Sequence, residues 1–342
     1  MKAVKLPSGS YRCQAYANGE RKSFTAPTKK EAELMAIEWQ NGKRSKPKAV
    51  TLGQAVKEYI ESKENLLSPS SVRGYYIIYE NSIDSIKDIP LAQISEKTLQ
   101  SWINANSISY SPKSVKSQFG LITAALRQNK VYLDFKSVLL PRIPKKEPII
   151  PNEEQIGQIL RMVEGTSVEL PVTIAVVLGL RQSEIAALKW SDYNGSMLDI
   201  HAAVVPNKEN RYIYKNSTKS AASTRKIEVD GILKARLDRA ERKSDFISPM
   251  LPSSVLRKFN QLCDKNGLPR FTMHAQRHGN ASLMLANGVP DKYAMARLGQ
   301  SSPNMIKNVY QHLYEAKEKQ FSKAMNDKFS ELTSHGIAHD EK

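Results

Sequence analysis

The sequence is poor in cysteine and has no long apolar run. Its 342 residues include two cysteines, Cys13 and Cys263, which are too few for a disulfide framework and lack the spacing of a zinc site. No apolar stretch is long enough to cross a bilayer, and the N-terminus has no apolar signal segment. We therefore expect a soluble cytoplasmic protein without a membrane partner.

Acidic residues are scarce relative to basic ones. The chain has 34 Asp and Glu against 51 Lys and Arg, which gives a formal net charge of +17. Such an excess is typical of nucleic-acid binding, because each neutralised phosphate releases condensed counterions. A basic protein that binds an anionic membrane or a ribosome is the alternative that charge alone leaves open.

The first 50 residues form a basic segment with eleven basic and four acidic residues. Two alternating runs on either side of a turn at 17–19 predict a pair of short strands. A helix is predicted over 29–40, capped by Thr28, with four apolar side chains on one face: Ala32, Met35, Ala36 and Trp39. We interpret 1–45 as a small domain, followed by a basic linker.

Residues 46–140 are predicted to form a helical module. Apolar residues recur at helical spacing after four start signals. A proline after serine is such a signal, because it presets the backbone angle at a position whose N–H has no partner in the helix. The four starts are Thr51, Ser68-Pro69, Ser95 and Ser111-Pro112.

The second half of the chain predicts a mixed domain. Prolines and basic residues over 141–151 indicate an extended linker. Residues 152–330 combine helices with short strands near 198–203, 212–214 and 225–229, and 331–342 form a polar tail. The expected fold is therefore multidomain and mainly α, with small β-sheets.

The first group of candidate site residues follows a glycine. Gly179 lets the chain turn, and Arg181 lies at the entrance of a predicted helix. Backbone donors at a helix entrance favour an anion. The structural alternative is an arginine that only pairs with Glu184.

The second group is His274-Ala275-Gln276-Arg277-His278. His274 and Arg277, three residues apart, project from neighbouring points of one helix face. A fixed cation beside a titratable group suits a reacting phosphodiester. His274 and His278 also have the spacing of a metal pair, but no carboxylate or thiol nearby supplies a third ligand, and Arg277 between them repels a cation.

The third group comprises Leu298-Gly299-Gln300 and Tyr310-Gln311-His312. A single tyrosine is more often a packing or surface residue than a nucleophile. The order of the groups along the chain is what makes Tyr310 a candidate.

With these residues the chain resembles the tyrosine recombinases, above all the two-site integrases of temperate phages and conjugative transposons. The resemblance also covers the first half, where 1–45 is similar to an arm-site DNA-binding domain and 46–140 to a helical core-binding domain, ahead of a catalytic domain at 152–330. The matching stretches are residues 179–190, Lys219 before 223–225, 274–278, 298–299 and 310–312.

The resemblance implies a role for each matching residue. Tyr310 is the nucleophile that forms a 3′-phosphotyrosine, and Arg181 and Arg277 hold the phosphate. Lys219 donates a proton to the leaving 5′ oxygen, and His274 is a general acid–base or a phosphate donor. Neither metal nor nucleotide cofactor is required. Three further residues are expected to be supporting or structural: Glu184, His278 and His312.

Two positions depart from the pattern or stay open. Gln300 stands where the family usually has histidine or tryptophan; glutamine can donate to a phosphate oxygen but cannot titrate. We expect a supporting role at the site for Gln300. The lysine is uncertain in register, because Lys215 and Lys226 lie near Lys219, which precedes a turn-like stretch and is preferred.

Two basic runs are candidates for contact with the DNA backbone. Their alternative role is that of solvated linker charge. The residues are Lys43, Arg44, Lys46, Lys48, Arg142, Lys145 and Lys146.

The sequence therefore predicts a site-specific recombinase that integrates or excises a mobile element. The expected partners are double-stranded DNA with core-type and arm-type sites, three further copies in a tetramer, and a DNA-bending protein and an excisionase. The C-terminal segment, roughly 315–340, is a candidate for exchange between protomers. The alternatives are a chromosome-dimer-resolving recombinase, a type IB topoisomerase, or a DNA-binding regulator of the same fold with weakened catalysis.

Overall fold

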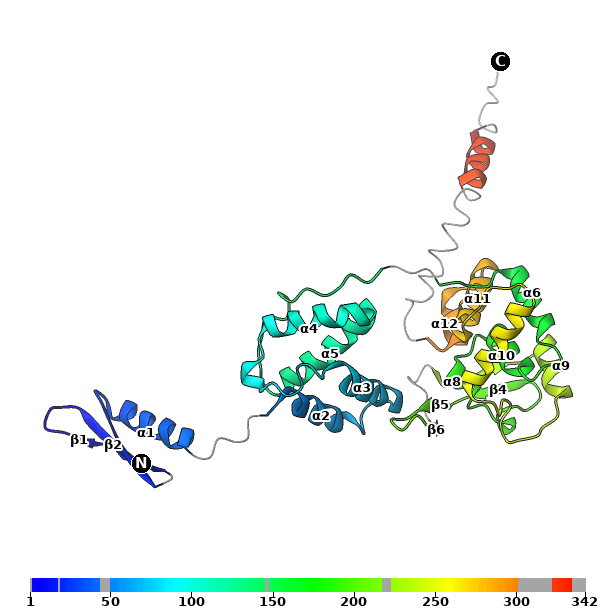
Figure 1. The fold of residues 1–342 in the computed structure, drawn as a ribbon. Coiled ribbons are helices and arrows are strands. Elements are labelled where there is room, and N and C mark those ends of the chain that lie inside the picture. The colour runs from blue at the N-terminus through cyan, green and yellow to red at the C-terminus, as the bar shows by residue number, and fades with distance from the viewer. Residues whose placement is uncertain are drawn as a thin grey trace, which may run out of the picture. The chain divides into compact units, whose positions relative to one another are not determined.

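The computed structural model describes residues 2–17, 19–43, 50–144, 148–216, 223–300 and 322–333. Contacts divide the chain into two compact units, Met1–Leu67 with Gly74–Ile143, and Ser68–Arg73 with Pro144–Lys342. Both are mainly helical and contain small sheets (Figure 1). The expected fold class is confirmed.

The N-terminal segment is a three-stranded antiparallel sheet with one helix on it (Figure 1). Its strands are β1 (Val4–Lys5), β2 (Tyr11–Ala17) and β3 (Glu20–Ala26), and α1 spans Lys29–Lys43. The Thr28 hydroxyl accepts the Glu31 amide at 3.3 Å, as expected of a cap. The sequence did not indicate β1.

The core of this segment is built from small side chains on one face of the sheet and of α1. Cys13, Ala15, Ala32 and Ala36 are buried, and Phe24 and Trp39 pack against them. Met35 was expected on the same face but is 46% exposed. Ala32, Ala36 and Trp39 therefore form the apolar face of α1 that packs on the sheet, without Met35.

Four helices form the module at 50–144, as predicted. They are α2 (Leu52–Lys63), α3 (Pro69–Ser82), α4 (Glu96–Ser109) and α5 (Pro112–Gln128), with a short 3₁₀ turn, η1 (Leu91–Gln93), before α4. Thr51, Ser95 and Ser111 each accept the backbone N–H three residues on, which confirms these helix starts. The Trp102 indole donates to the Ser82 carbonyl at 2.8 Å and ties α4 to the end of α3.

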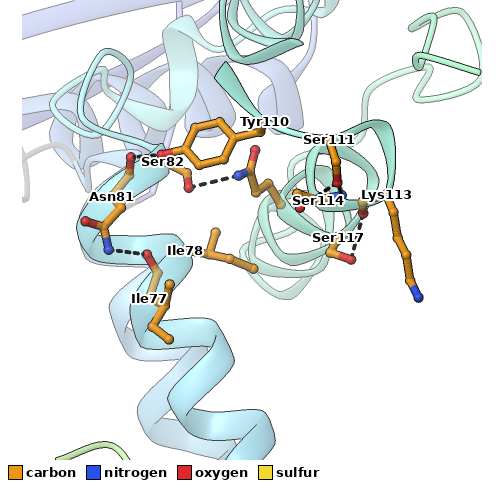
Figure 2. Close-up of a pocket in the computed structure, with 10 residues that line it drawn as sticks. Ile77, Ile78, Asn81, Ser82, Tyr110, Ser111, Lys113, Ser114 and Ser117 are labelled. Carbon is orange, nitrogen blue, oxygen red and sulfur yellow. Dashed lines mark hydrogen bonds between the residues drawn. The ribbon is translucent and has the colours of Figure 1, made fainter. Parts of the chain in front are cut away.

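A pocket of about 610 Å³ opens on this module between the end of α3 and the start of α5 (Figure 2). Its polar groups are largely paired within the module: Tyr110 donates to the Asn81 carbonyl, and Ser117 to the Lys113 carbonyl. None of the candidate catalytic residues lines it. The pocket therefore does not mark the reactive centre.

The rest of the chain packs helices around a buried central helix, α7 (Glu169–Leu178), whose residues from Pro171 to Val176 are all buried. It contacts α6, α8, α9 and α11. The apolar core of this unit includes residues from Ile156 to Ala275. Its other helices are α6 (Glu153–Met162), α8 (Gln182–Ile185), α9 (Gly231–Arg239), α10 (Pro252–Lys265), α11 (Met273–Ala286) and α12 (Asp291–Leu298), with a 3₁₀ turn η2 (Trp190–Asp192).

Two separate two-stranded sheets accompany these helices. β4 (Met197–Ile200) pairs with β7 (Arg225–Glu228), and β5 (Ala203–Pro206) pairs with β6 (Tyr212–Lys215), both antiparallel. Strands were expected near β4, β6 and β7, while β5 was not. β6 and β7 belong to different sheets and do not pair with each other.

Residues 322–333 form a further helix whose side chains are all exposed. Residues 331–333, expected in a polar tail, belong to this helix. Among the described residues, no helix combines the length and apolar character needed to span a membrane.

Candidate active site

Gly179 controls the entry of the chain into the site. It ends α7 with a left-handed backbone, φ 62°. A Cβ at this position would lie 2.6 Å from Leu298 Cδ2 and 2.9 Å from Asn280 Oδ1, so α11 and α12 both pack directly against the glycine. The close approach places Arg181 next to the end of α12.

Arg181 precedes α8, as expected, although that helix has four residues only. Its Nη1 donates to Glu184 Oε1 at 2.6 Å and to Ser223 Oγ at 3.4 Å. Its Nη2 donates to the Gly299 carbonyl at 3.1 Å. The side chain is still 30% exposed, so an anion in solvent can reach it.

Glu184 is a buried carboxylate shared by two arginines. One oxygen accepts Arg181 Nη1, and the other accepts the Arg181 amide at 2.9 Å and Arg225 Nη2 at 3.3 Å. Burial opposes ionisation, but the charge of Arg225 and the contacts with Arg181 outweigh it and lower the pKa of Glu184. The carboxylate is therefore ionised at neutral pH and fixes both guanidinium groups.

Arg277 lies on α11 and is 1% exposed. Its Nη1 donates to the Gly179 carbonyl at 2.8 Å and its Nη2 to the Leu298 carbonyl at 2.7 Å. Within the described part of the chain its Nε has no hydrogen-bond partner. Burial and the charge of Arg181 lower the pKa of Arg277 to about 9, which leaves it charged at neutral pH.

His274 precedes Arg277 by one helical turn, as the spacing predicted. Partial burial of its ring, followed by the charges of Arg277 and Arg181, lowers its pKa. The imidazole is therefore neutral at pH 7 and retains an acceptor nitrogen. Its ring meets the His278 ring edge to face, with centroids 4.7 Å apart. Among the described residues no group of three His, Cys, Asp or Glu is placed to hold a metal.

Three arginines converge on three consecutive carbonyl groups at the C-terminus of α12. Arg225 Nε donates to the Arg297 carbonyl at 2.8 Å, Arg277 to that of Leu298, and Arg181 to that of Gly299. Carbonyl groups at a helix C-terminus carry partial negative charge and accept cations. The geometry brings together residues that are more than 100 positions apart in the sequence.

Gln300 follows directly after Gly299, which ends α12 with φ 62°. The Gln300 amide donates to the Met295 carbonyl at 3.0 Å, which closes the helix end. The backbone of Gln300 thus adjoins the carbonyl held by Arg181.

Ser223 and Arg225 take part in the network although nothing in the sequence indicated it. Arg225 was quoted only as part of a matching stretch, and its side chain is 8% exposed, at the centre of the network. Its place at the start of the strand predicted at 225–229 gave no signal that it would reach Glu184. Ser223 is fully buried and bonds to Gly299 as well as Arg181.

Several candidates lie outside the described residues: Tyr310, His312, Lys219, Arg44, Lys46, Lys48, Lys145 and Lys146. The same is true of the Lys43 side chain, whereas Arg142 is described and exposed. Of the alternative lysines, Lys215 ends β6 opposite Ala203, and Lys226 on β7 lies 3.9 Å from Asp199.

Family models match both halves of the chain. The model of the phage integrase family matches residues 152–317, and that of the phage integrase N-terminal SAM-like domain matches residues 51–106. The first match includes every candidate catalytic residue.

Two curated relatives span most of the chain. A XerC-like tyrosine recombinase of Caldanaerobacter subterraneus subsp. tengcongensis is 23% identical and is covered over 92% of its length and 90% of this chain. The integrase of Staphylococcus phage L54a is also 23% identical, over 82% of its length and 71% of this chain.

Solved structures share the fold. The Tn1549 transposon integrase in complex with transposon right-end DNA has a TM-score of 0.64 at 17% identity, over 79% of this chain and 99% of that one. The lambda integrase tetramer bound to a Holliday junction has a TM-score of 0.57 at 18% identity, over 88% of this chain and 95% of that one.

Proposed function

Because this chain belongs to the phage integrase family of tyrosine recombinases, we propose that it cleaves and rejoins DNA at specific sites through a 3′-phosphotyrosine on Tyr310. The proposed biological role is the integration and excision of a mobile element. The observation that supports the chemistry most directly is the convergence of Arg181 and Arg277 on the carbonyl groups at the end of α12, with a neutral His274 one helical turn before Arg277.

The reaction requires charge neutralisation at the non-bridging oxygens of one phosphate. Arg181 supplies an exposed guanidinium whose fork matches two phosphate oxygens, and a phosphate can replace the Gly299 carbonyl as its acceptor. Arg277 supplies a second charge and an Nε donor without a partner among the described residues. Glu184 holds Arg181 in place, so that little reorganisation is needed when the phosphate arrives.

In the proposed reaction each bond that forms replaces one that breaks, and each proton has a donor and an acceptor. The Tyr310 oxygen forms a bond to phosphorus, and the bond from phosphorus to the 5′ oxygen breaks. Lys219 gives a proton to that leaving oxygen. His274, neutral at pH 7, has an acceptor nitrogen for the tyrosine proton. Religation is the reverse, with a 5′ hydroxyl of the partner strand as the nucleophile.

A nicked suicide duplex made from the DNA beside the gene tests this function, since integrase genes commonly lie next to an attachment site. The wild-type protein is expected to form a covalent adduct that survives denaturation, and Tyr310→Phe is expected to form none. Tyr293→Phe is a matched control, because Tyr293 is 69% exposed on α12 and has no proposed role. A non-covalent shift without any adduct would instead identify a DNA-binding regulator.

The exposed face of the N-terminal sheet is proposed to read arm-type DNA sites. Arg12, Gln14 and Tyr16 alternate with buried residues on β2, and their partners across β3 are Thr25, Ser23 and Arg21, all exposed. The major groove admits a two-stranded ribbon, and arginine and glutamine can bond guanine and adenine edges there. The basic run at 43–48 and Arg142 are proposed to contact phosphates along the way.

A tetramer on two synapsed duplexes is the proposed assembly, because the exchange of four strands needs four nucleophiles. The fold neighbour from lambda was solved as a tetramer bound to a Holliday junction. The helix at 322–333 exposes Met325, Phe329 and Leu332 at 53%, 58% and 61%, in a spacing that places them on one face. We propose that this face packs on a neighbouring protomer and that its replacement by serines abolishes synapsis but not single-site binding.

A chromosome-dimer-resolving role is the second candidate, because the XerC-like relative is matched over 90% of this chain. That coverage reaches well beyond the catalytic half, so an additional N-terminal segment does not by itself exclude resolution. Resolution acts on two identical sites in one molecule, whereas integration joins two different sites. A plasmid assay that offers both substrates separates the two roles.

A further inference from the structure

Two segments that the proposed reaction needs are attached at neighbouring points. Lys219 lies four residues before Ser223, and the stretch that leads to Tyr310 begins after Gln300. Ser223 is fully buried, and its Oγ donates to the Gly299 carbonyl at 3.4 Å. The attachment points of both segments are therefore joined by a direct hydrogen bond.

Arg225 makes the stronger connection between these points. Its Nη1 donates to the Ser223 carbonyl at 2.8 Å, and its Nε donates to the Arg297 carbonyl at 2.8 Å. Its Nη2 donates to Glu184, the carboxylate that also fixes Arg181. One guanidinium thus links the start of β7, the end of α12 and α8.

All three nitrogens of Arg225 are engaged by protein groups, and its side chain is 8% exposed. This arrangement leaves it no open face for a phosphate, unlike Arg181. Its role differs from that of the residues to which the family resemblance assigned chemistry.

We propose that Arg225, assisted by Ser223, is a positioning residue that clamps the start of β7, which follows Lys219 in the chain, to the end of α12, from which the chain continues to Tyr310. Through Glu184 this clamp is also tied to Arg181, so a change at Arg225 is expected to disturb the placement of the general acid and of the nucleophile relative to the phosphate. This inference rests on the proposed function and adds a residue to it. A lysine at position 225 offers one nitrogen in place of three and cannot make the same contacts.

The test is single-turnover cleavage at saturating DNA by Arg225→Lys, with Ser223→Ala as a milder second variant. The substrate is the core-site suicide duplex that the wild-type protein cleaves, with either oxygen or sulfur at the bridging 5′ position. A sulfur leaving group departs without a donated proton, because thiols have a pKa of about 8.5, far below that of an alcohol. The sulfur substrate therefore reports on the Lys219 segment in particular.

We expect Arg225→Lys to cleave the oxygen substrate about 100-fold more slowly than wild type, the effect of a misplaced reacting group. On the sulfur substrate the defect is expected to shrink by about tenfold or more, because the general acid no longer contributes. DNA affinity is expected to match the wild type. A residual defect on sulfur reports displacement of the Tyr310 segment.

Arg236→Lys is the matched control. Arg236 is also buried, at 3% exposure, and binds Thr173, Glu169 and the Leu160 carbonyl, away from the site. Arg236→Lys should lower the midpoint temperature of thermal unfolding. It should leave cleavage by the folded protein near the wild-type rate on both substrates. The clamp is rejected if Arg225→Lys behaves like Arg236→Lys, or if its defect is equal on oxygen and sulfur. Failure of the wild-type protein to form an adduct would reject the proposed function itself.

Discussion

Arg181 donates to both oxygens of the Glu184 carboxylate, from Nη1 to Oε1 at 2.6 Å and from its backbone amide to Oε2 at 2.9 Å. The same short turn thus fixes the position of the arginine and the direction of its guanidinium. From the sequence, a purely structural pairing of Arg181 with Glu184 was the alternative to a role in the site. In the structure this pair is itself part of the geometry of the site. In the proposed reaction, Nη1 stays paired with Glu184 while Nη2 is available to the phosphate.

Glu184→Gln is expected to destabilise the protein by about 3 kcal/mol, because two buried arginine contacts lose their counter-charge. The cleavage rate should fall by more than the loss of folded protein explains, since Arg181 and Arg225 both lose their contact with the carboxylate. Urea unfolding and single-turnover cleavage measure the two effects. Glu169→Gln is the control, because Glu169 pairs with Arg236 away from the site; an equal loss of cleavage in both variants would contradict this account.

Gly179→Ala is expected to cost about 3 kcal/mol of stability and to abolish cleavage, because left-handed strain adds to a clash with Leu298 and Asn280. Gly165→Ala separates the two effects. Gly165 also has a positive φ, 69°, but open space around it, so about 1 kcal/mol and normal cleavage are expected. Equal costs for the two variants would show that packing against α12 is unimportant.

The free energy of unfolding should depend on His274 when the pH falls below 6.5, the ordinary pKa of a histidine. Its pKa is lowered in the folded state, so the unfolded chain binds a proton first and stability is lost as pH falls from 6.5 through the lowered pKa. His274→Gln is expected to flatten this dependence in urea unfolding between about pH 5 and 7. An unchanged slope in the variant would place the titrating group elsewhere. Glu184 contributes to the pH dependence of stability only below pH 4.5, the ordinary pKa of a glutamate.

Gln300→His should preserve or raise cleavage, because histidine, like glutamine, can donate to a phosphate oxygen and can also move a proton. Single-turnover rates on the suicide duplex measure this. A large fall in rate would show that the amide of glutamine is specifically required after Gly299.

Arg12→Ala with Gln14→Ala should weaken binding to arm-type DNA and leave cleavage of an isolated core site unchanged. Each lost base contact is expected to cost about 1–3 kcal/mol of discrimination. Lys29→Ala on α1 removes a comparable charge outside the strands and serves as the control. If the two variants weaken arm-site binding equally, the sheet face does not read bases.

The sequence predicted those helix starts that depend on interactions within one helical turn. The starts of α2, α4 and α5 follow from Thr51, Ser95 and Ser111, whose caps depend on residues within one turn. The helical spacing of His274 and Arg277 was likewise predictable.

Long-range pairing was not predictable in the same way. β7 pairs with β4 across 24 intervening residues, from Ile200 to Arg225, and nothing within either strand specifies that partner. The role of Arg225 escaped detection for the same reason, since its contacts with Glu184 and Arg297 exist only in the folded chain.

The apolar core around α7 draws on residues from Ile156 to Ala275 and includes none from the N-terminal sheet or the four-helix module. In the proposed function, catalysis and target recognition therefore depend on separate hydrophobic cores. We expect that residues 1–143 of a relative with another target can be joined to this half without repacking its core, with Ser68–Arg73, which group with the second unit, kept from this chain. A change of DNA target then requires only a suitable fusion point, and the proline-rich stretch before Asn152 provides one.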